Sequence, residues 1–107
     1  MADLTVTAAD VRPLAGCIIR RFTAGAAITV GVPVYISAAN TITTCIGTSV
    51  AAAAAVGVMV AAPDGAAAAA TGDECDVVLY GPVAGYPCTA GAYYYVDDDA
   101  GVISTIT

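Results

Sequence analysis

Several residue types on which enzymes and nucleic acid binders rely are absent from this sequence. Its 107 residues include no histidine, no lysine and no tryptophan. The only cations are Arg12, Arg20 and Arg21, against nine carboxylates, so the net charge is -6. Catalysis by a histidine or lysine base is therefore excluded, and we do not expect an enzyme. Nucleic acid is not an expected partner either, because a binder needs a basic face to neutralise phosphates.

Long uninterrupted apolar runs are also absent. Gly57 and a Pro63-Asp64-Gly65 turn interrupt the longest one, which leaves it short of the roughly 20 residues that a membrane-spanning helix needs. The first residues, "MADLTVTAADVRPL", hold acids and an arginine where a signal peptide has a basic flank and a long apolar stretch. We therefore expect no membrane partner and a protein that is synthesised in the cytoplasm.

The four cysteines follow none of the common metal-binding spacings. Cys17, Cys45, Cys75 and Cys88 lie 28, 30 and 13 residues apart, and no histidine is available to complete a zinc site. We expect no metal and no cofactor. Two interpretations of the cysteines remain open: buried small hydrophobic residues, or one or two disulfides in an oxidising compartment, for which three pairings exist.

Alanine, valine, isoleucine and tyrosine dominate what is present. Alanine accounts for 25 residues and leucine for only three, so the core depends on β-branched and aromatic side chains, which favour strands. The length suits one domain. Turn residues separate about seven short apolar segments at intervals of about ten residues, a pattern typical of a small sandwich or barrel. The expected strands are 16–23, 31–37, 41–45, 56–61, 75–81, 92–96 and 102–106.

The sequence therefore predicts an all-β fold, a single small β-barrel or sandwich over residues 16–107, with at most one short helix. Ala38-Ala39-Asn40 suits the turn of a hairpin, because asparagine tolerates a positive φ. The helix is expected in the alanine run 66–70, between a capping aspartate and Gly72. The similar run 51–55 is expected to be a loop.

Residues 1–15 form an expected N-terminal arm, since their alternation of polar and apolar residues, with Leu4 and Val6 apolar, ends at Pro13. Such an arm can pair with the sheet edge of a neighbouring molecule, or it can be a floppy terminus. Both alternatives remain open.

The adjacent Arg20 and Arg21 point to opposite faces if their strand is regular. One of them is then expected to pair with a carboxylate of this chain or of a partner. The alternative is that both lie on an exposed edge strand and deter aggregation.

Three consecutive tyrosines, Tyr93, Tyr94 and Tyr95, cannot all enter one core, because strand residues alternate between faces. At least one faces outward, either as an interface anchor or as the cover of a neighbouring strand. The aspartates 97–99 that follow are consecutive, unlike the alternating ligands of a calcium loop, so a solvated turn is favoured over a cation site.

The order of these segments resembles the small capsid decoration, or cement, proteins of tailed bacteriophages. The motifs that carry the likeness are "VGVPVYI", "GVMVAA", "GDECDVVLYGPVAG" and "GAYYYV", spread along nearly the whole chain. The resemblance implies a structural virion protein on the outer capsid surface. It implies that the major capsid protein is the partner and that the protein stabilises contacts between neighbouring capsid subunits. Proteins of this kind are commonly homotrimers, so the resemblance also implies a homotrimer.

We expect the contacts with the capsid or with other copies to come from the arm, the arginines and the tyrosines, since an acidic capsid surface would attract the few cations. The expected contact residues are Leu4, Val6, Arg12, Arg20, Arg21, Tyr86, Tyr93, Tyr94 and Tyr95. The alternative function is a self-assembling surface fibre or filament subunit that polymerises by strand addition.

Overall fold

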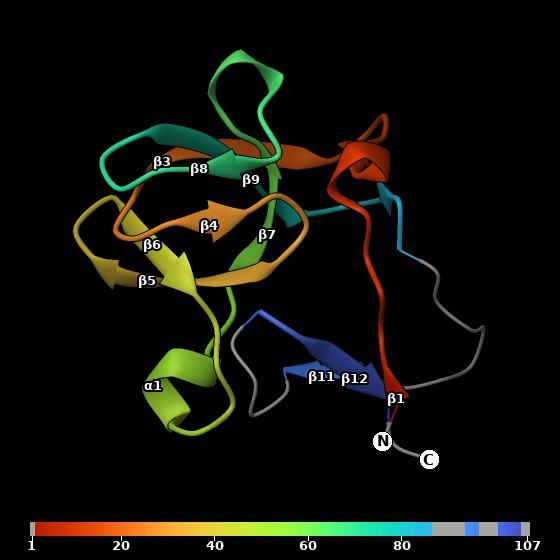
Figure 1. The fold of residues 1–107 in the computed structure, drawn as a ribbon, viewed down its shortest axis with the longest axis vertical. Coiled ribbons are helices and arrows are strands. Elements are labelled where there is room, and N and C mark those ends of the chain that lie inside the picture. The colour runs from red at the N-terminus through yellow and green to blue at the C-terminus, as the bar shows by residue number, and fades with distance from the viewer. Residues whose placement is uncertain (1, 87–93, 97–100, 106–107) are drawn as a thin grey trace.

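A closed barrel of five strands forms the centre of the structure, a computed structural model that describes residues 2–86, 94–96 and 101–105 (Figure 1). Neighbouring barrel strands are antiparallel, except that β3 and β6 run parallel. In order around the barrel they are β3 (Ile18–Ala24), β6 (Thr41–Thr44), β5 (Pro33–Ala38), β7 (Gly57–Ala61) and β9 (Glu74–Tyr80). The expected all-β barrel is confirmed.

Three small sheets accompany the barrel, and their strands are two or three residues long. Two of them are pairs: β2 (Arg12–Pro13) with β10 (Val83–Ala84), and β4 (Ile28–Thr29) with β8 (Ala68–Ala69). The third has the order β1 (Ala2–Asp3), β12 (Ile103–Thr105), β11 (Tyr94–Val96). The barrel strands together with β11 and β12 correspond to the seven strands that the sequence predicts. Two 3-10 turns, η1 (Ala8–Asp10) and η2 (Pro63–Gly65), lie between the strands.

The barrel interior is filled mainly by β-branched side chains, as the composition predicts. On β3, Phe22 and Ala24 are buried and Thr23 between them is half-buried, which is the alternation expected of a strand with one face on a core. The largest fully buried side chains are Ile28, Ile42, Met59, Val34, Val77 and Cys45.

The hairpin of β5 and β6 forms where the sequence predicts it. Asn40 occupies the turn with a φ of 55°, a conformation that asparagine adopts more readily than most residues. The hydroxyls of Ser37 and Thr43 share a hydrogen bond of 2.9 Å across the pair.

The short helix lies in the other alanine run, so the prediction for both runs is wrong. Helix α1 spans Val50–Ala53, where the Ser49 hydroxyl caps it by accepting a hydrogen bond of 3.1 Å from the Ala52 N–H. In the run 66–70, Ala68 and Ala69 instead pair with β4. Asp64 cannot cap a helix there because its φ is 58°, whereas a capping residue is extended.

The N-terminal arm packs on its own chain. β1 pairs with β12, and the Leu4 N–H donates to the Ile103 carbonyl at 2.7 Å. Farther along, Val11 is buried and β2 lies against β7. The backbone pairing that could serve a neighbouring molecule is therefore used within the chain at β1 and β2. Among the described residues, no helix is long and apolar enough to cross a membrane.

Candidate interaction surface

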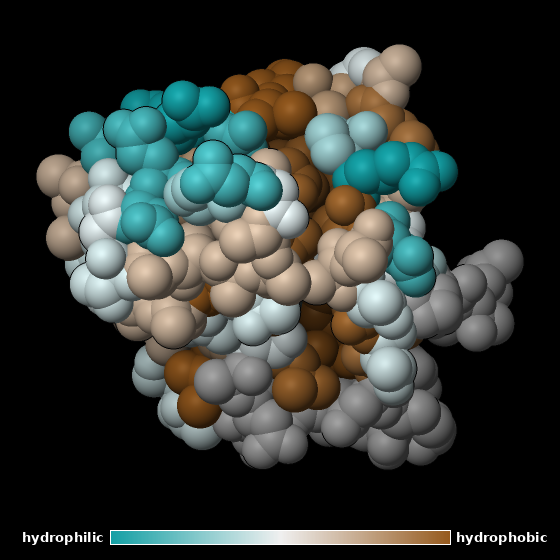
Figure 2. Space-filling view, turned by 45° about the horizontal axis from the view of Figure 1, so that its top comes forward, coloured by the Kyte–Doolittle hydropathy of each residue, from teal (hydrophilic) through white to brown (hydrophobic). Residues whose placement is uncertain are grey.

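Five large apolar side chains are exposed together at one end of the β3 and β9 pair, and we call this set the apolar tip. Their exposed fractions are 41% for Leu14, 58% for Ile18, 44% for Ile19, 36% for Leu79 and 74% for Tyr80. Single exposed apolar residues are normal, but five at the end of one strand pair make this end a candidate interaction surface. Figure 2 shows hydrophobic residues gathered at the upper edge of the molecule, with hydrophilic residues on either side.

The tip is exposed because β3 and β9 extend beyond their neighbours in the barrel. β9 pairs with β7 only as far as Val78, and β3 pairs with β6 only at Thr23 and Ala24. Past these points only β3 and β9 remain, with Ile18 opposite Tyr80 and a β-bulge between Ile18 and Ile19. No third strand among the described residues pairs with this end of the ribbon.

A tight loop contact places Leu14 beside the ribbon. The Leu14 N–H donates to the Pro82 carbonyl at 3.0 Å, and the Cys17 N–H donates to the Leu14 carbonyl at 3.4 Å. Gly81 has a φ of +110°, and a Cβ at this position would lie 2.6 Å from the Cys17 Cα. Only glycine allows this approach, so the backbone that carries Leu14 is held against the end of β9.

Two of the three cations flank the tip without an ion-pair partner among the described residues. Arg20 lies over the ring of Phe22, 5.4 Å from its centroid, and Arg12 is exposed on β2, two residues before Leu14. Arg21 instead pairs with Asp76 at 3.2 Å and with Glu74 at 3.7 Å. The prediction that one of the adjacent arginines pairs with a carboxylate is thus confirmed for Arg21.

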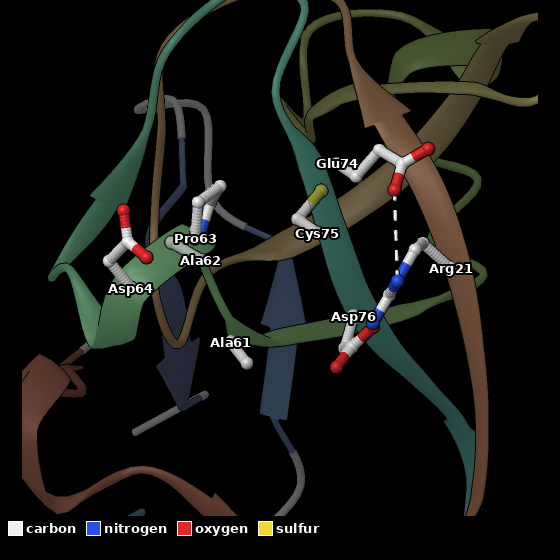
Figure 3. Close-up of a pocket in the computed structure, with 8 residues that line it drawn as sticks. All are labelled: Arg21, Ala61, Ala62, Pro63, Asp64, Glu74, Cys75 and Asp76. Carbon is white, nitrogen blue, oxygen red and sulfur yellow. Dashed lines mark hydrogen bonds and ion pairs between the residues drawn. The ribbon is translucent and has the colours of Figure 1, made fainter.

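A shallow hollow of about 350 Å³ lies between β3, β9 and η2 (Figure 3). Arg21, Asp64, Glu74 and Asp76 bring charge to it, and Cys75 lies between them. Burial raises the pKa of the Cys75 thiol, and the charges of Asp76 and Asp73 raise it further. Its Sγ donates a hydrogen bond of 3.5 Å to the Phe22 carbonyl. A thiol held in the protonated form is a poor nucleophile, so the hollow offers no activated cysteine.

The cysteines that the structure describes are free thiols. Cys45 and Cys75 are buried and Cys17 is half-buried, while Cys88 lies outside the described residues. Burial also raises the pKa of Cys45. The interpretation as small buried hydrophobic residues therefore holds for Cys45 and Cys75. Within the described ranges, no three His, Cys, Asp or Glu side chains are grouped so that they could hold a metal ion.

Three of the predicted contact residues, Leu4, Val6 and Tyr86, lie where the arm meets the barrel. Leu4 and Val6 line a small cavity of about 130 Å³. The Tyr86 hydroxyl donates a hydrogen bond of 2.6 Å to the carbonyl of Gly31. A Cβ at Gly31 would lie 3.0 Å from a methyl carbon of Val6, so the arm lies close to the backbone there. In this chain these residues hold the arm in place and are half-buried.

Of the three consecutive tyrosines in the predicted contact set, two lie on a described strand and one does not. Tyr94 and Tyr95 belong to β11, opposite Thr105 and Ser104 of β12. Tyr93 and the aspartates 97–99 lie outside the described residues.

The apolar tip itself is missing from the predicted contact set, although the sequence carries a signal for it. Ile18 and Ile19 are consecutive on a strand, so one of them must point away from the core, by the same reasoning that applies to the tyrosines. Leu79 and Tyr80 repeat that pattern on the partner strand.

Comparison with protein-family models, with curated proteins and with solved structures gives no match to this chain.

Proposed function

We propose that this protein is a structural virion protein that binds the outside of a bacteriophage head and stabilises contacts between major capsid subunits. The observation that carries the proposal is the apolar tip, defined by Leu14, Ile18, Ile19, Leu79 and Tyr80, on a closed barrel. Large apolar side chains exposed near one another are typical of a surface that other proteins cover. The kind of partner comes from the resemblance to capsid decoration proteins.

The motifs that carry this resemblance fall on the framework that holds the tip. "VGVPVYI" reaches into β5 as far as Ile36, "GVMVAA" covers β7, and "GDECDVVLYGPVAG" runs through β9 into β10. These strands belong to the closed barrel from which the β3 and β9 ribbon extends, so the tip is carried by a fixed framework. This supports a role in protein contact.

The alternative of a fibre subunit has less support. Polymerisation by strand addition needs a terminal strand that is free to leave its own chain. Here β1 pairs with β12, β2 pairs with β10, and Val11 between them is buried. Donation of the arm would require breaking these pairings first.

A homotrimer on the shell is part of the proposal, since it is the common form among the proteins that this sequence resembles. Several weak contacts made by one oligomer act together, because each contact after the first is effectively intramolecular. A small interface per copy is then enough for stable attachment to a shell of repeating subunits.

Co-sedimentation tests the proposed function. The purified protein is mixed with empty shells assembled from the major capsid protein encoded in the same genome. We expect binding that saturates at a fixed number of copies per shell, and a higher temperature for shell disruption. Absence from the shell pellet would contradict the proposal, and filaments formed by the protein alone would support the fibre subunit.

A further inference from the structure

We infer that the apolar tip, flanked by Arg12 and Arg20, docks into an apolar depression with an acidic rim on a different protein. The inference rests on the proposed function, in which that protein is the capsid subunit. It adds which surface of this chain makes the contact and what chemistry the subunit presents. Tyr80 is the expected central anchor, since it is the most exposed of the five tip residues at 74%.

The chemistry of the tip suits a protein partner. Tyrosine and arginine are among the residue types that most often dominate binding energy, and surrounding contacts exclude water from them. Tyr80 lies opposite Ile18 on a paired strand, so its backbone is fixed before binding. A preformed anchor loses little conformational freedom on docking.

The distribution of charge on this chain favours a partner whose binding surface has an acidic rim. The chain carries a net charge of -6, so an acidic partner repels it in most orientations. Arg21 is neutralised by Asp76 and Glu74, which leaves Arg12 and Arg20 as the cations that attract such a partner. Both lie beside the tip, and at physiological salt charges act over only about 8 Å. Attraction is therefore confined to the surface that carries the apolar anchors.

The same charges disfavour a second copy as the occupant. A two-fold contact between identical tips would bring Arg12 and Arg20 of both copies into one interface. Like charges facing each other across an interface oppose binding. The tip is thus better suited to a partner of opposite charge than to the tip of a second copy of this chain.

Paired double variants test the inference in the co-sedimentation experiment. Ile18→Ser with Tyr80→Ser removes two tip side chains, while the control, Ile36→Ser with Val50→Ser, removes two exposed apolar side chains elsewhere, which are 49% and 92% exposed. We expect the dissociation constant for shells to rise at least about tenfold for the tip variant and less than about twofold for the control. Circular dichroism checks that both variants fold.

If the double tip variant fails to fold, Tyr80→Thr replaces it, because threonine keeps the strand propensity and removes the ring. Equal binding by the wild type and the tip variant would overturn the inference and leave the proposed function standing. Failure of the wild type to bind shells would overturn both. Light scattering provides a further check: conversion of a wild-type oligomer into a monomer by the tip substitutions would identify the tip as a self-interface and overturn the inference.

Discussion

The two ends of the β3 and β9 ribbon differ in burial although they belong to the same two strands. At the inner end, Phe22 lies opposite Cys75, and both are buried in the barrel. At the outer end, Ile18 lies opposite Tyr80, and both are exposed. Both ends carry apolar residues, so hydrophobicity does not separate them. The difference is that β6 and β7 cover the inner end and stop before the outer one.

The two ends of the ribbon therefore contribute differently: the inner end to the stability of the fold and the outer end to binding. Apolar surface that is covered within the chain stabilises the fold, whereas the same kind of surface left open can contribute only when another molecule covers it. Substitutions at the inner end should therefore lower the free energy of unfolding. Substitutions at the outer end should lower binding instead.

The largest expected effect separates the two ends directly. Phe22→Ala should lower the free energy of unfolding by about 3–5 kcal/mol, because it removes a buried ring and leaves a cavity. Ile18→Ala, at a side chain that is 58% exposed, should lower it by less than about 1 kcal/mol. Urea unfolding of both variants measures the two values. Similar losses in the two variants would mean that the outer end is covered within the chain.

Gly81→Ala should disturb the outer end through the backbone. The added Cβ would approach the Cys17 Cα, and alanine is strained at a φ of +110°. We expect a loss of about 1–3 kcal/mol in unfolding free energy and weaker shell binding, because the loop that carries Leu14 must move. Gly16→Ala is the matched control, since Gly16 also has a positive φ but its Cβ would meet nothing within 4 Å. Equal effects on binding would show that the close approach is unimportant.

Stability should fall at alkaline pH because of two buried thiols, Cys75 at the inner end and Cys45 directly after β6. Burial raises the pKa of Cys45 and Cys75 above the ordinary value of 9.0, so the folded state keeps thiol protons that the unfolded state has already released. Their contribution to stability is complete below about pH 9 and is lost as pH rises through the folded pKa values. Comparing urea unfolding of the wild type with that of Cys45→Ala and Cys75→Ala isolates this slope. A slope that persists unchanged in both variants would exclude the thiols as its source.

The smallest effect concerns the rate of association. Arg12→Gln and Arg20→Gln should each slow binding to shells by about twofold to tenfold at low salt, and the difference should shrink as salt screens the charges. Arg21→Gln changes the net charge equally but removes a cation that Asp76 and Glu74 already neutralise. Stopped-flow light scattering compares the three rates. An equal reduction in all three would indicate an effect of net charge alone.

Much of the barrel could be predicted because its signals are local. The turn at Asn40 and the runs of β-branched residues define strands without reference to the rest of the chain. The predicted helix is wrong because Ala68 and Ala69 pair with a strand about 40 residues earlier, a long-range contact that outweighs alanine's helix propensity. The sequence predicts that one of the adjacent arginines pairs with a carboxylate, but not which arginine or which carboxylate. Arg21 meets Asp76 because the register between β3 and β9 places them opposite each other.

The apolar tip could not be located from sequence alone for a similar reason. Adjacent isoleucines indicate that one side chain points outward, but not whether another element covers it. That depends on where β6 and β7 end relative to β3 and β9, which is a property of the closed barrel. Val77 and Val78 illustrate the opposite outcome, since they are also adjacent on a strand and both are buried.

Hydroxyl-radical footprinting of the wild-type protein, free and bound to empty shells, tests the central claim most directly. The side chains that shell binding shields should be Leu14, Ile18, Ile19, Leu79 and Tyr80, while the exposed Ile36 and Val50 keep their reactivity. Unchanged reactivity of the tip residues in a sample that is fully bound to shells would contradict the assignment of this surface.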